Sequence, residues 1–157
     1  MTGVQTCALP IYPLLPPHLL TQALLDGVAA WLLVLLMYQE IFAAEAFLPT
    51  ARHATLLLLW ILATSTLLHL LMVWGEVSLT HPTAHARLAI WEMVRGRYKS
   101  DFWIGTVLSF AGGLIPALAL FGVIGISLGV AGAPLALIGL MLYEHAYVQA
   151  GQSVPLA

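Results

Sequence analysis

Four long apolar stretches, separated by shorter polar intervals, dominate the hydropathy pattern of the chain. An α-helix needs about 20 residues to cross roughly 30 Å of bilayer hydrocarbon, and each stretch is about that long. The predicted spans are residues 19–38, 54–75, 102–121 and 131–149. The pattern therefore predicts an all-α integral membrane protein in which four transmembrane helices form a bundle.

The long polar interval between the second and third stretches, 76–101, contains a shorter amphipathic pattern. The apolar residues of this pattern recur three positions apart and are Leu88, Trp91 and Val94. Arginines occupy the other faces of the same helical wheel. Thr80 suits the N-cap, and Pro82 suits the first turn. We therefore predict a short amphipathic helix over 84–98 that lies in the membrane interface.

Prolines and glycines mark boundaries and contacts within this pattern. The prolines of YPLLPP predict that no helix begins before about His18. Gly112, Gly113 and Pro116 fall in the middle of the third span, where they predict a kink or a close helix contact. The Gly-rich segment 122–130 leaves the last turn unplaced.

The composition agrees with a lipid environment. The chain is 61% hydrophobic and 8% charged, whereas soluble domains carry about 25% charged residues. A net charge of −2 gives no basic surface for nucleic acid. The single cysteine, Cys7, excludes an intrachain disulfide and a multi-cysteine metal site within the chain.

The basic residues predict the orientation of the bundle. Four of the five lie in the 76–101 interval, namely Arg87, Arg95, Arg97 and Lys99. The fifth, Arg52, falls on the opposite side. The positive-inside rule therefore places the 76–101 loop in the cytoplasm, and an even number of spans places both termini there too.

The first eleven residues, MTGVQTCALPI, do not fit the rest of the chain. They lack the basic start and long apolar core of a signal peptide. They resemble the peptide that results when a sequencing adapter is translated in frame with a truncated gene. We expect residues 1–11 to be an artefactual leader, and 12–157 to be the bundle and a fragment of a larger membrane subunit. The alternative is a natural, disordered N-terminus.

Ionisable residues at bilayer depth are candidates for function, because each costs at least about 2.5–3.5 kcal/mol to insert. Asp26 and His69 fall within predicted spans, and Glu76 follows His69 by seven residues on the same helix face. Histidine titrates near neutral pH, and a desolvated carboxylate can titrate near it. Asp26, His69 and Glu76 are thus candidates for a proton path. The alternatives are an interfacial Asp26 and a His69 that only hydrogen-bonds a neighbouring helix.

Other ionisable residues lie nearer the predicted membrane boundary. Glu144 and His145 could pair with the basic loop, and Glu92 fits a solvated loop charge. A bis-histidine haem needs two histidines at matched depth on facing helices, and His69 is alone in lying well inside a predicted span. We therefore expect no haem in this chain.

Three segments of the chain carry a family resemblance. They are LLHLLMVWGE, RGRYKSDFWIGTVLSFAGGLIPALAL and LIGLMLYEHAYVQAGQSVPL. In order and spacing they resemble the C-terminal half of the polysulfide reductase membrane-subunit family, the NrfD type. The FW-x-G start of a span, the mid-span proline and the terminal AGQ-x-V-P-L are the most specific parts, and the resemblance covers roughly residues 19–157.

The resemblance implies a haem-free anchor in the bacterial inner membrane that binds quinone. Such subunits exchange electrons with a ferredoxin-like iron–sulfur subunit, which connects to a molybdopterin or multihaem cytochrome subunit. Some members are proposed to translocate protons.

The sequence departs from the family in two respects. It has four spans where two four-helix bundles are expected, and the bundle associated with the quinone pocket is missing. Its YEH at 143–145 stands where many relatives carry a basic residue. No quinone ligand can be assigned, and the alternative to a redox subunit is a small four-helix transporter or membrane scaffold.

Overall fold

The computed structural model describes residues 15–42, 48–81 and 83–154, and all the regular structure in these ranges is helical. Four helices are long and apolar enough to cross a membrane, as the sequence predicts. The six helices are α1 (Leu15–Phe42), α2 (Leu48–Ser78), α3 (Ala84–Val94), α4 (Lys99–Leu120), α5 (Ile126–Gly129) and α6 (Gly132–Ser153).

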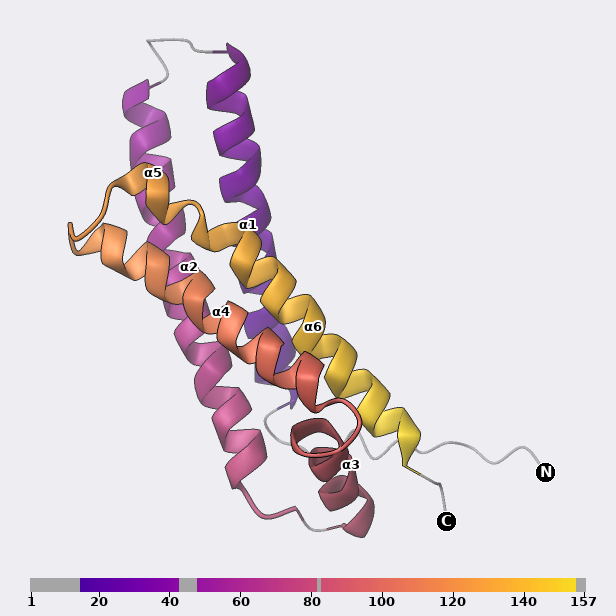
Figure 1. Cartoon of the computed structure of the whole chain (residues 1–157). Coiled ribbons are helices and arrows are strands. Elements are labelled where there is room, and N and C mark those ends of the chain that lie inside the picture. The colour runs from indigo at the N-terminus through magenta and orange to yellow at the C-terminus, as the bar shows by residue number, and fades with distance from the viewer. Residues whose placement is uncertain (1–14, 43–47, 82, 155–157) are drawn as a thin grey trace.

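The spanning helices form an up-and-down bundle of two pairs (Figure 1). Helices α1 and α2 pack along one another, and α4 and α6 pack along one another across them. The start of α1 and the end of α6 lie at the end of the bundle where α3 also lies, opposite α5 (Figure 1). The 76–101 interval, the start of the first span and the end of the last span therefore lie at the same end of the bundle.

Three predicted boundaries are wrong, two at helix starts and one at a helix end. The short helix predicted over 84–98 ends at Val94. Helix α1 begins at Leu15, so Pro16 and Pro17 lie inside its first turn rather than preventing it. Proline is tolerated there because the first turn has no intrahelical use for its missing N–H. Helix α3 is capped by Thr83, whose hydroxyl accepts from the Ala86 N–H at 3.2 Å, and not by Thr80.

Glycines bring α4 and α6 into close contact. A Cβ on Gly112 would lie 2.5 Å from the Ala136 nitrogen, and one on Gly105 would lie 2.7 Å from the Tyr143 nitrogen. Gly113, on the same helix, faces α2, and a Cβ there would lie 2.7 Å from Thr66 Cγ2. The predicted close packing of the mid-span glycines is confirmed, because no side chain fits where the backbones meet.

The bundle has an apolar interior at most levels and an apolar exterior. Buried leucines fill the interior, including Leu25, Leu32, Leu59, Leu62 and Leu140. Large apolar side chains such as Trp31, Trp60 and Phe110 are about half exposed or more on the outside. A surface of this kind suits lipid as the surrounding solvent. A few small hydroxyl side chains, such as Ser65 and Ser109, are also buried, and the buried histidine and carboxylate side chains lie toward the α3 end.

Candidate functional site

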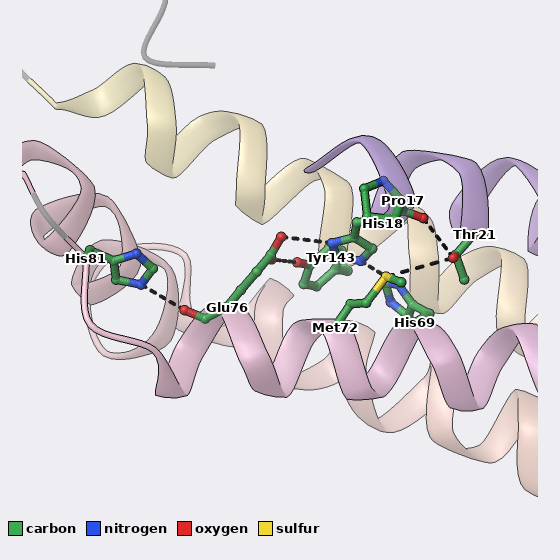
Figure 2. Close-up of polar contacts among 8 residues, drawn as sticks. All are labelled: Pro17, His18, Thr21, His69, Met72, Glu76, His81 and Tyr143. Carbon is green, nitrogen blue, oxygen red and sulfur yellow. Dashed lines mark hydrogen bonds and ion pairs between the residues drawn. The ribbon is translucent and has the colours of Figure 1, made fainter. Parts of the chain in front are cut away.

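Four titratable side chains from three helices meet inside the α3 end of the bundle (Figure 2). His18 comes from α1, His69 and Glu76 come from α2, and Tyr143 comes from α6. Their exposed fractions are 2%, 0%, 4% and 1%. We call these four residues the His–Glu–Tyr cluster. Polar groups buried this deeply need partners, because an unpaired one costs several kcal/mol in a membrane interior.

The cluster supplies those partners in a continuous chain of hydrogen bonds. The Tyr143 hydroxyl donates to Glu76 Oε2 at 2.7 Å. Glu76 Oε1 lies 2.9 Å from His18 Nδ1. His18 Nε2 in turn lies 2.9 Å from His69 Nδ1. Both carboxylate oxygens and three of the four ring nitrogens are therefore bonded within the cluster.

Helix geometry explains why these residues meet. His69 and Glu76 are two turns apart on α2, so they project from one face. The first turns of α1 bring His18 between them, and the Thr21 hydroxyl donates to the Pro17 carbonyl at 2.8 Å within those turns. Tyr143 reaches the cluster from α6 at the level where the α4 backbone passes at Gly105. The phenol ring stands edge-on to the His69 imidazole, with centroids 5.0 Å apart.

The chain of hydrogen bonds ends at His69. His69 Nε2 is buried and has no hydrogen-bond partner among the described residues. The Ser109 hydroxyl on α4 is the other buried side-chain atom in this condition. An unpaired ring nitrogen at the end of a hydrogen-bonded chain can accept or release a proton without breaking a bond in the chain.

Backbone contacts of Glu76 connect the cluster to α3. The His81 Nε2–H donates to the Glu76 backbone carbonyl at 2.8 Å (Figure 2). Arg87 on α3 donates from a guanidinium nitrogen to the His81 carbonyl at 3.0 Å. These two bonds fix the last turn of α2, which carries Glu76, against the start of α3.

The structure brings together two of the three proton-path candidates. His69 and Glu76 both belong to the cluster, although His18 joins them and they do not touch directly. Asp26 lies about two turns beyond His18 on α1, is partly buried, and takes no part in the cluster's hydrogen bonds. The proton-path role of all three stays a prediction.

Asp26 does have an acidic neighbour on α6. Glu144, the residue after Tyr143, lies within electrostatic range of both Asp26 and His18. His145 pairs with Asp101, a residue of the 76–101 interval, with His145 Nε2 and Asp101 Oδ2 3.7 Å apart at the start of α4.

Sequence reasoning missed His18 and Tyr143. His18 was assigned to the boundary of the first span, and Tyr143 was noted only as part of YEH. A signal was present in both cases. His18 follows two prolines that suit a helix start, and Tyr143 lies seven residues after Ala136 and four after Gly139, on the face that packs against α4. Neither signal predicts which side chain of another helix His18 or Tyr143 contacts.

No group of three or more His, Cys, Asp or Glu able to hold a metal ion occurs in the part of the chain that the structure describes. Comparisons with protein-family models, with curated proteins and with solved structures give no match for this chain. The fold and the site therefore define its class on their own. The chain is a multi-pass helical membrane protein with a buried, hydrogen-bonded cluster of titratable side chains.

Proposed function

We propose that this chain is a membrane anchor subunit of a quinone-linked respiratory oxidoreductase complex, and that the His–Glu–Tyr cluster transfers protons within it. The observation that carries the proton-transfer part is the unbroken chain from Tyr143 through Glu76 and His18 to His69. Proton relays in membrane proteins are built from such Asp, Glu and His chains.

The hydrogen bonds define how one proton would pass. With Glu76 ionised, His18 Nδ1–H donates to it, and His69 Nδ1–H donates to His18 Nε2, which leaves His69 Nε2 unprotonated. A proton added at His69 Nε2 lets the His69 Nδ1 proton move to His18 Nε2. The His18 Nδ1 proton then moves to Glu76. One proton has entered at His69 and one has reached the carboxylate, with both imidazoles switched to their other tautomer.

Tyr143 and His81 have positioning roles in this scheme. The Tyr143 hydroxyl bonds the carboxylate oxygen that does not face His18, so it stabilises the ionised form and fixes its orientation. His81 holds the backbone carbonyl of Glu76. Asp26 is a candidate for a separate branch of proton movement, because it lies outside the cluster's hydrogen bonds and both ring nitrogens of His18 are already bonded.

The redox part of the proposal is supported by the family resemblance of the three sequence segments. Under that proposal a ferredoxin-like iron–sulfur subunit and a molybdopterin or multihaem cytochrome subunit supply or accept the electrons. The proposal assigns no quinone ligand to a residue of this chain. The complex lies in the bacterial inner membrane, with the 76–101 loop and both termini in the cytoplasm.

The test is purification of the chain from its native membranes, followed by reconstitution into vesicles. We expect an iron–sulfur subunit to co-purify, with its electron paramagnetic resonance signal, and quinol-dependent turnover to acidify or alkalinise the vesicle lumen. Glu76→Gln or His69→Ala should slow proton movement at least about tenfold while assembly persists, because positioned proton carriers contribute about 10²–10⁴ in rate. Asp26→Asn should impair it if the branch operates.

Asp101→Asn is the matched control for these variants, because it also removes one carboxylate but at a half-exposed site outside the cluster. Proton movement that survives Glu76→Gln would remove the cluster from the mechanism. A chain that purifies without an iron–sulfur partner, yet moves a solute together with protons, would instead support the transporter alternative.

A further inference from the structure

A pocket of about 260 Å³ lies between the end of α2 and α3. Its walls are apolar and come from Val77 on α2 and from Ile90, Trp91 and Val94 on α3. Two arginines, Arg87 and Arg95, also line it. The pocket lies outside the His–Glu–Tyr cluster, and the proton-transfer scheme does not use it.

The charges around this pocket have one sign. Arg87, Trp91 and Arg95 follow one another at four-residue spacing, so they form a stripe along α3 with an arginine on each side of the indole. Arg87 and Trp91 lie within α3 and Arg95 is its C-cap, so the stripe spans eight positions, or about 12 Å. Among the residues that the structure describes, no carboxylate lines the pocket, and the nearest in sequence, Glu92, accepts from the Arg97 backbone N–H through Oε2 at 3.1 Å. One Arg87 guanidinium nitrogen is held by the His81 carbonyl, which fixes that side chain and leaves it further donors.

The pocket also lies at the boundary of the membrane-spanning segments. Val77 belongs to the last turn of a candidate span that ends at Ser78, and the next span begins at Lys99. Large apolar side chains beside the pocket are exposed, including Trp91 at 51%, Leu88 at 42% and Leu79 at 58%. Tryptophan is typical of the headgroup level of a bilayer.

We propose that this pocket binds the headgroup of an anionic phospholipid. The guanidinium groups of Arg87 and Arg95 would donate to the phosphate oxygens, because arginine matches the geometry of phosphate and carries a permanent charge. The acyl chains would then lie along Leu88 and Trp91. Apolar walls at a membrane boundary favour a lipid over a soluble phosphate, and basic pockets between membrane helices bind such headgroups.

Lipid in this pocket would also brace the α3 end of the bundle. His81 lines the pocket and at the same time holds the backbone carbonyl of Glu76. An occupied pocket therefore limits the movement of the last turn of α2. This inference depends only on the membrane location of the bundle, and it stands or falls separately from the redox and proton-transfer proposals.

The experiment is native mass spectrometry of the full chain in detergent, with added phosphatidylglycerol or phosphatidylcholine. We expect one phosphatidylglycerol retained per chain, with phosphatidylcholine retained at least about tenfold less. Arg95→Gln should lower phosphatidylglycerol retention at least fivefold. Arg97→Gln is the matched control. It removes the same charge two residues further along the chain, and the Arg97 side chain does not line the pocket.

Three outcomes would overturn the inference. Phosphatidylcholine could be retained as well as phosphatidylglycerol, which would leave no role for the headgroup charge. Arg97→Gln could lower retention as much as Arg95→Gln, which would reduce the effect to net charge. Inorganic phosphate at millimolar concentration could displace the retained lipid completely, which would make the site one for a soluble anion. Circular dichroism of both variants checks that each remains helical.

Discussion

His18 and Glu76 are 58 residues apart in the chain, and their side chains meet inside the bundle with His18 Nδ1 2.9 Å from Glu76 Oε1. Both side chains are almost fully buried. The contact joins α1 to α2 at the end of the bundle where α3 lies. It is also the middle bond of the cluster, so breaking it separates Tyr143 and Glu76 from His69.

The His18–Glu76 contact predicts energetic coupling between the two residues. A double-mutant cycle with His18→Ala and Glu76→Ala should give a coupling free energy of about 1.5–3 kcal/mol, the range for hydrogen bonds to charged groups. The measurement is reversible unfolding in mixed detergent micelles. Asp26→Ala paired with Glu76→Ala is the control, because Asp26 shares no hydrogen bond with the cluster. A coupling near zero in the first cycle would show that the contact does not form.

The close approach of α4 and α6 predicts opposite effects for two glycine substitutions. Gly139→Ala places a methyl group against the Ser109 backbone nitrogen, so the helices must separate and the free energy of unfolding should fall by about 1–3 kcal/mol. Gly27→Ala adds the same methyl group in α1 with no atom within 4 Å. It should raise the free energy of unfolding by about 0.5–1 kcal/mol, because alanine loses less backbone entropy in a helix. Equal effects of the two would contradict the tight interface.

The charge distribution predicts which side of the membrane each loop faces. In a chain with Cys7 replaced by Ser, Lys99→Cys should resist an impermeant thiol reagent applied to intact cells, and Arg52→Cys should react with it. After the cells are opened, both should react. Labelling of Lys99→Cys from outside intact cells would reverse the orientation and remove the cytoplasmic assignment of the α3 end.

The sequence predicts that the chain carries no haem. His18 and His69 hydrogen-bond to one another through His18 Nε2 and His69 Nδ1, and His18 Nδ1 is bonded to Glu76. A bis-histidine haem needs one iron-binding nitrogen on each of two rings, and both ring nitrogens of His18 are already bonded. An absorption spectrum of the purified chain should therefore show no Soret band under oxidising or reducing conditions. Such a band, lost in His69→Ala, would contradict this expectation.

Much of the architecture follows from hydropathy alone. The long apolar runs predicted four spanning helices, and apolar residues three positions apart predicted the short helix α3. These features were predictable because a bilayer requires every backbone polar group to be satisfied within its own segment, so helix length and composition decide the fold class. The mid-span glycines of α4 predicted close packing for the same local reason, the absence of a side chain.

The cluster was only half predictable. His69 and Glu76 lie on one helix, where a seven-residue spacing fixes a shared face. His18 and Tyr143 lie on α1 and α6, and only the packing of the bundle puts them beside Glu76. Asp26, on the same helix as His18, lies about two turns beyond it and outside the hydrogen-bonded chain. Helical periodicity determines which side chains of one helix point the same way, whereas the rotation and depth of neighbouring helices, set by contacts such as Gly105 against Tyr143, decide which side chains meet.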